Sequence, residues 1–244
     1  MAGYLSISRL SWKFWALFAA QASIMPYSAM ADPRPFIATY SANIDLLIDL
    51  PASAHRELKR SENDTWHFSN NASALMAKQQ EWSELTYSNG QWTPLAYHYE
   101  RKLLGRTRSI EINFDETKGR ITTPVNGDPW RQRWEPAVQD RLSYQLQLRE
   151  DLKSGREVLD YRIADGGQIK NYRFTRLGQE ILKTPAGEFE CIRLQLDRQG
   201  QQHTTLIWMA PELDYLTVRL LRIDNEGREH LMNLKELEYT DEQR

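Results

Sequence analysis

The chain has 244 residues, with 31 Lys and Arg against 33 Asp and Glu and a formal net charge of −2 at pH 7. Its length fits one or two domains, and a charged share of 26% is that of an ordinary globular protein, which excludes disorder throughout. Without residues 1–31 the balance is 29 basic to 33 acidic residues, a charge of −4. Because nucleic-acid-binding domains are normally basic, no nucleic-acid partner is expected.

Residues 1–31 are typical of a cleavable secretory signal. Arg9 and Lys13 precede a short apolar run, and Ala29 and Ala31 place small side chains at both key positions of a cleavage site. The run is shorter than the about 20 apolar residues that span a membrane. Cleavage would leave Asp32 where a bacterial lipoprotein carries its acylated cysteine, so no lipid anchor is expected. We predict a soluble periplasmic protein, residues 32–244, without a transmembrane span.

From residue 37 to residue 239 the dominant pattern is an alternation of apolar and polar residues, which is typical of β-strands. Turn residues, several of them glycines, separate the segments. The clearest hairpins pair residues 95–99 with 110–114, 158–163 with 169–177, 189–196 with 204–209, and 216–223 with 230–239. No helices separate these strands, so the pattern predicts a mostly β, single-domain antiparallel meander.

One principal α-helix is predicted, over about residues 140–154. Asp140 is a good N-cap, a wide apolar arc follows, and Ser154-Gly155 ends the pattern. One helix within a long meander favours a curved sheet or partial barrel, with the helix packed on or into the concave face. The longest stretch predicted to be irregular is 121–139, which contains three prolines.

Several motifs resemble an exported bacterial family known as domain of unknown function 3108. The motifs are Pro94-Leu95-Ala96-Tyr97-His98-Tyr99, Asp140-Arg141-Leu142-Ser143, Gly178-Gln179-Glu180, Thr184-Pro185-Ala186-Gly187-Glu188-Phe189 and Trp208-Met209-Ala210-Pro211-Glu212-Leu213-Asp214-Tyr215-Leu216. The resemblance covers most of the mature chain and implies a periplasmic, mostly β protein. It transfers no catalytic residues.

No enzyme signature is found in the chain. The five histidines lack metal-ligand spacing, and no serine stands in a nucleophile elbow. His98 and Glu100 share one strand face and could form an acid–base pair, but a solvated face is the commoner arrangement. The single cysteine, Cys191, could be a nucleophile, yet its alternating surroundings favour a buried strand residue. We therefore expect no catalytic residue, no metal and no cofactor.

One aromatic and basic cluster is a candidate contact site. Trp130, Arg131, Arg133 and Trp134 lie between prolines and could contact an anionic, partly apolar partner such as a lipid or an envelope protein. The alternative is that the tryptophans close one end of the sheet while the arginines pair with nearby acids.

Three classes of function remain open. The first is a non-enzymatic periplasmic module that binds or carries an apolar or lipid-like ligand. The second is an interaction or assembly factor of the cell envelope, and the third is a hydrolase with an unrecognised site. The chain offers apolar strands and no convergent catalytic set, so the binding module is preferred. In that case Leu146 and Leu148 of the helix should face the sheet, with apolar surface open beside them.

Overall fold

The computed structural model describes residues 32–45, 49–75, 77–125, 128–198, 200 and 202–240, which pack as one unit. The predicted signal, with Ala29 and Ala31, lies outside the described residues. The elements are β1 (Phe36–Asp45), β2 (Asp49–Arg60), η1 (Glu62–Asp64), β3 (Trp66–Ala74), β4 (Ala77–Ser88), β5 (Gln91–Leu103), β6 (Arg106–Asp115), β7 (Arg120–Val125), β8 (Asp128–Arg133), β9 (Val138–Gln139), α1 (Ser143–Lys153), β10 (Leu159–Ala164), β11 (Ile169–Thr184), β12 (Gly187–Arg198), β13 (Thr204–Ala210), η2 (Pro211–Leu213), β14 (Leu216–Ile223) and β15 (Glu229–Tyr239).

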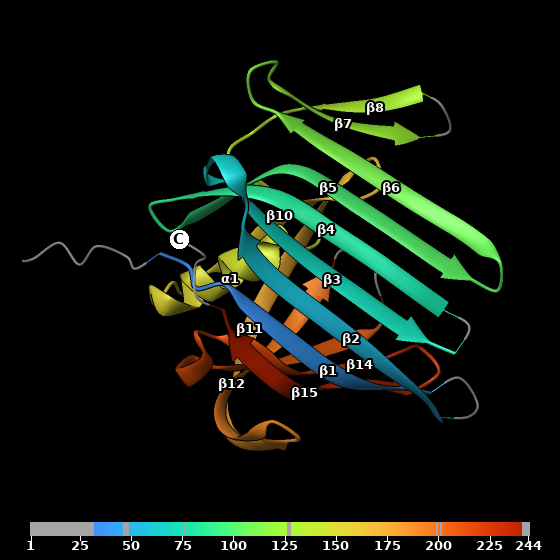
Figure 1. Ribbon diagram of the computed structural model, residues 1–244, viewed down its shortest axis with the longest axis vertical. Coiled ribbons are helices and arrows are strands. Elements are labelled where there is room, and N and C mark those ends of the chain that lie inside the picture. The colour runs from blue at the N-terminus through green and yellow to red at the C-terminus, as the bar shows by residue number, and fades with distance from the viewer. Residues whose placement is uncertain are drawn as a thin grey trace, which may run out of the picture. The chain divides into compact units, whose positions relative to one another are not determined.

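All the described strands belong to one sheet, in the order β8-β7-β6-β5-β4-β3-β2-β1-β15-β14-β13-β12-β11-β10-β9. Strands adjacent in sequence are adjacent in the sheet, except β8 and β9, which form its two edges. The first and last strands pair at its centre, with Phe36 opposite Tyr239 (Figure 1). Every pairing is antiparallel except that of β9 with β10, in which Val138 lies beside Arg162. The predicted antiparallel meander is thus confirmed, with one short parallel addition at an edge.

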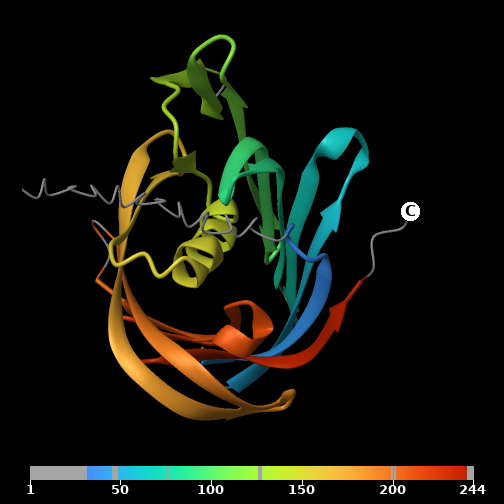
Figure 2. The ribbon, with the colours of Figure 1, turned by 90° about the vertical axis from the view of Figure 1, so that its left-hand side faces the viewer.

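The sheet curls around the helix, so the predicted curved sheet with a helix on its concave side is also confirmed (Figure 2). Strand twist and β-bulges both bend a sheet in this way. Bulges or register shifts occur at Thr39/Tyr40, Glu84/Leu85, Arg176/Gly178 and Trp208/Met209.

We call the sheet face that is turned toward α1 the inner face. Tyr144 of α1 identifies it, because its ring packs against Tyr172 and Phe174 of β11 with centroid distances of 5.3 and 5.9 Å. On the other arm, Trp92 and Tyr97 of β5 are each 1% exposed. Large side chains on alternate positions therefore form the core around the helix.

The region 121–139 is not irregular as predicted. It contains β7, β8 and β9, and its first two prolines, Pro124 and Pro129, lie opposite one another. Pro124 stands beyond the last paired position of β6 and β7, and β8 is an edge strand, so the missing N–H groups cost few ladder bonds. A second local difference concerns Leu95, which the alternation of residues 95–99 places on the same face as Tyr97 and Tyr99. It is instead the extra, half-buried residue of the bulge in β5.

Candidate functional site: the inner face of the sheet

Polar bonds hold α1 against the inner face. Gln147 Oε1 accepts a hydrogen bond from the backbone N–H of Trp92 at 2.8 Å, and Asp151 Oδ2 accepts one from the Tyr161 hydroxyl at 2.7 Å. Gln147 and Asp151 are themselves buried and are joined by a further bond of 3.0 Å. Because these bonds reach both arms of the sheet, the helix is a fixed part of the core.

The space beside the helix is filled. Leu146 and Leu148 are each 2% exposed and face the sheet, as expected. The expected open apolar surface beside them is absent, however: the cavity lined by Leu146, Arg149 and Trp92 measures about 10 Å³. That is about the volume needed for one water molecule. A ligand could not lie alongside the helix without displacing it.

Asp140 fixes the start of α1. Its Oδ1 accepts hydrogen bonds from the backbone N–H groups of Leu142 and Ser143, at 2.7 and 2.8 Å, and from Ser83 Oγ at 2.8 Å. Ser143 Oγ in turn accepts from the Asp140 backbone N–H at 2.8 Å, so Asp140 caps the turn that leads into α1. The helix itself runs from Ser143 to Lys153, within the predicted range of about 140–154. The carboxyl is 0% exposed and its Oδ2 has no hydrogen-bond partner. Burial raises its pKa to about 6, and the hydrogen bonds to Ser143 and Leu142 oppose that rise.

A second buried acid, Glu81 on β4, also has its bonds made. Asn70 Nδ2 donates to Glu81 Oε1 at 2.8 Å, and the Tyr97 hydroxyl donates to Oε2 at 2.9 Å. Burial, followed by the charge of Glu81, raises the pKa of Tyr97 well above its usual range. Both carboxylate oxygens are occupied by neighbouring strands, so this group serves the sheet rather than a reaction.

Exposure on the inner face increases with distance from the helix. Along β5 it rises from 1% at Trp92 to 5% at Tyr99, and Arg101 is exposed. Along β14 it rises from 0% at Val218 through half-buried Leu220 to exposed Arg222. The register places these positions of the two arms at the same end of the sheet. We call this end, opposite the helix, the far end of the inner face.

Small and apolar side chains cover part of the far end. Ala52 lies opposite Ala74, and Ala54 lies opposite Ala72, so these four residues of β2 and β3 form an alanine patch. Beyond β1, Leu220 and Met232 lie opposite one another on β14 and β15, and both are half-buried. Solvent therefore reaches apolar surface on the inner face at this end.

Arginines complete the far end; one is Arg106, opposite Leu103, and four others are considered together. Arg101 and Arg108 lie directly opposite each other on β5 and β6, Arg198 lies opposite Tyr172, and Arg222 lies opposite His230. We call these four residues the arginine group. Sequence patterns alone do not single these residues out, although each continues the period-two pattern of inward side chains on its strand.

The predicted aromatic and basic cluster is divided by its strand. Trp130, opposite Thr123, is half-buried on the inner side of β8, whereas Arg131 and Arg133 are exposed on its outer side. Trp134 follows the strand and packs against the hydrophobic core. The tryptophans and arginines thus do not share one surface, and a ligand contact at these four residues stays a prediction.

Cys191 is buried, as predicted. It lies on β12, is 0% exposed, and burial raises the pKa of its thiol to about 11. A thiol with so high a pKa is almost entirely protonated at neutral pH, and the thiolate is the reactive form. The burial and the high pKa of the Cys191 thiol therefore favour a structural role for this residue.

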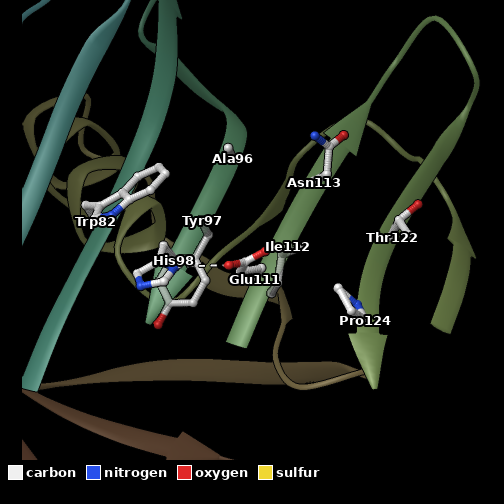
Figure 3. Close-up of a pocket in the computed structure, with 9 residues that line it drawn as sticks. All are labelled: Trp82, Ala96, Tyr97, His98, Glu111, Ile112, Asn113, Thr122 and Pro124. Carbon is white, nitrogen blue, oxygen red and sulfur yellow. Dashed lines mark ion pairs between the residues drawn. The ribbon is translucent and has the colours of Figure 1, made fainter. Parts of the chain in front are cut away.

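A hollow of about 370 Å³ lies on the outer face of the sheet (Figure 3). Its sides carry Trp82 and His98 on one hand and Pro124 on the other. The Trp82 ring stacks between His98, at a centroid distance of 5.5 Å, and His67, at 5.7 Å. Ring pairs across adjacent strands stabilise a sheet, so the stack has a structural explanation.

His98 does not pair with Glu100, the partner considered from the sequence. Its Nδ1 lies 3.7 Å from Glu111 Oε1, and Glu100 instead pairs with Lys102 at 2.9 Å. Across the described ranges, no group of three or more His, Cys, Asp and Glu side chains could hold a metal ion. No described helix is long and apolar enough to cross a membrane.

Comparison with known proteins identifies the family and the fold. The family model described as "Protein of unknown function (DUF3108)" matches residues 52–230. A comparison with curated proteins found no match.

Among solved structures, a β-barrel-like protein of domain of unknown function DUF1849 from Brucella abortus is similar, with a TM-score of 0.59 at 9% identity, covering 85% of this chain and 98% of that one. A putative exported protein with a YmcC-like fold from Bacteroides fragilis matches at 10% identity, with a TM-score of 0.35 over 84% of this chain and 96% of that one. At such identities the first match establishes a shared fold, and the second is too distant in structure to support an argument.

Proposed function

Because the chain belongs to the DUF3108 family of proteins of unknown function, we propose a role from its inner face: a non-enzymatic periplasmic binding module for an apolar or lipid-like ligand. The observation that carries the proposal is the rise in exposure along the inner face. The helix closes one end, and apolar side chains remain accessible at the other. Ligand sites are concave and mostly apolar, and the mouth of a β-barrel is one of their common places.

The far end supplies surfaces suited to an acyl chain. Every side chain of the alanine patch on β2 and β3 is a single methyl group, so no large side chain of the patch projects from this part of the inner face. Leu220 and Met232 supply larger apolar contacts. Covering such surface stabilises a complex by roughly 25 cal/mol for each Å² of apolar area removed from water.

A pair of adjacent substitutions tests this position for the ligand. Ala72→Phe would add a ring on the inner face, between the cross-strand neighbours Ala54 and Gln79. Ser73→Phe adds the same ring to the next residue, which is exposed on the outer face. An apolar fluorescent probe should bind the purified mature protein, and extracted lipid should displace it. Ala72→Phe should weaken probe binding by at least about tenfold, and Ser73→Phe should leave it unchanged.

The outcomes separate the three classes. Absence of probe binding, or equal binding by both variants, contradicts a ligand on the inner face. The assembly-factor alternative then leads, because edge strand β8 pairs on one side only and presents exposed Arg131 and Arg133. The same preparation, incubated with ester, phosphate and peptide substrates, should show no turnover. Turnover abolished by a single substitution would support the hydrolase instead.

A further inference from the structure

The far end of the inner face places like charges opposite one another. Arg101 and Arg108 are cross-strand partners, both exposed. Neither has an ion pair with an acid of the described residues, although Lys102 and Glu100, the neighbours of Arg101 on the outer face, are paired with each other. Like charges in this position destabilise a sheet. An arrangement that costs stability needs another reason, and an anion between the two guanidinium groups would remove the repulsion.

The second half of the arginine group comes from the other arm of the sheet. Arg198 is held over the Tyr172 ring, with Cζ 4.2 Å from the ring centroid. Arg222 follows half-buried Leu220 on the inner face of β14. The pKa of His203 lies below its ordinary value because the ring is partly buried and because Arg222 and Arg198 disfavour another positive charge there. The charges of Arg198 and Arg222 thus both act on the space around His203.

The curl of the sheet brings the arms toward each other at this end. A methyl group at Gly166, in the β10–β11 turn, would lie 3.9 Å from Ile110 Cδ1 on β6. Ile110 stands two residues from Arg108, on the same face. Lys170 of β11 is neutralised by Asp165, with Nζ 2.6 Å from Oδ2, and the charge of Asp224 acts on Arg222. Arg101 and Arg108 therefore carry the positive charge near this seam that has no paired acid among the described residues.

From this arrangement we infer that the ligand is a lipid with an anionic headgroup, which the arginine group binds while the acyl chain lies along the alanine patch, Leu220 and Met232. The inference rests on the proposed function and adds its chemical class. Charge complementarity carries it: the whole chain has a net charge of −2, yet the described strand residues of the inner face beyond Glu81 include no acid. Guanidinium groups bind phosphate and carboxylate oxygens in a bidentate manner.

The apolar neighbours favour a lipid headgroup over a free anion. A soluble phosphate would gain nothing from the alanine patch or from Met232, whereas an amphiphile covers both surfaces at once. In a lipid complex the acyl chain supplies most of the affinity, and the headgroup determines which lipid is preferred.

The test compares two soluble lipids that share an acyl chain, lysophosphatidylglycerol and lysophosphatidylcholine, each below its micelle concentration. Displacement of the apolar probe gives the affinity of the full mature protein for each. The anionic lipid should bind about tenfold more tightly at low salt, and the preference should shrink as ionic strength rises. The double change Arg101→Gln with Arg108→Gln should abolish the preference while leaving affinity for the zwitterionic lipid unchanged. Inorganic phosphate should not displace the probe.

The matched control is Lys59→Gln with Lys78→Gln, which removes the same charge from exposed positions on the outer face of β2 and β4 and should leave the preference intact. Binding of both lipids with equal affinity, or equal effects of the two double variants, overturns the inference but leaves the proposed function standing. Displacement by inorganic phosphate also overturns it, in favour of a free anion. If neither lipid binds, the proposed function itself fails.

Discussion

The buried carboxyl of Asp140 should make stability depend on pH in an unusual direction. Asp140→Asn keeps an acceptor oxygen for Ser83 and for the backbone N–H groups of Leu142 and Ser143, so the cap of α1 can persist. The substitution removes only the ability to ionise. Comparing the free energy of unfolding of the two proteins therefore isolates the titration of this one group.

The size and sign follow from the two pKa values. Burial raises the pKa of Asp140 from 3.8 to about 6, so the folded chain holds the proton more tightly than the unfolded chain. This contribution to stability is complete below the unfolded pKa and is lost as pH rises through the folded pKa. The full shift corresponds to about 3 kcal/mol, of which about 2 kcal/mol lies between about pH 4.5 and about pH 7.5.

Urea unfolding at several pH values between these limits measures the effect. The free energy of unfolding of the unsubstituted protein minus that of Asp140→Asn should fall by about 2 kcal/mol across the range. Asp160→Asn is the control: Asp160 is exposed, and Arg173 holds its pKa below the ordinary value, so its difference should stay flat. A flat or rising difference for Asp140→Asn would refute the reasoning, because it would mean that burial does not raise the pKa of this carboxyl.

Three shorter predictions concern other residues. Arg101→Gln should raise the free energy of unfolding by a few tenths of a kcal/mol by ending the opposition with Arg108, and the gain should vanish in high salt; a loss of stability in urea unfolding would contradict this. Cys191→Ala should cost about 1 kcal/mol, and native protein should react with a thiol reagent only as slowly as it unfolds; rapid labelling would revive a reactive thiol. N-terminal sequencing of the protein from periplasm should begin at Asp32, since cleavage is expected after Ala31, and full-length chain in the cytosol would contradict export.

The hairpins could be predicted from sequence because local alternation and local turns determine them. The predicted pairing of residues 95–99 with 110–114 holds, with Tyr97 opposite Ile112 and Tyr99 opposite Ile110. The cap at Asp140 was visible for the same reason, since its partner Ser143 is three residues away. Pairing of β1 with β15 was not predicted, because no local feature links Phe36 to Tyr239.

The filling of the space beside the helix could not be predicted either. The apolar arc of α1 suggested one buried face with surface open beside it, yet polar residues on its other faces are buried too. Gln147 is 4% exposed and Asp151 6%, and each is bonded to a strand. Hydrophobic periodicity does not report such bonds, because it counts these residues as solvent-facing.

The arginine group shows how the sequence can indicate a site once the inner face is known. On β5 the inward series runs Tyr97, Tyr99, Arg101, and on β12 it runs Leu194, Leu196, Arg198. On both strands the inward-facing positions of the series are apolar until the last one, which is an arginine. A charged side chain in that phase, at the end of a strand, costs little because the long side chain can reach solvent. The same step on β6 and β14, at the same end of one curled sheet, concentrates positive charge beside apolar surface. That combination matches an amphiphile with an anionic headgroup, and neither a packed core nor an ordinary solvated surface requires it.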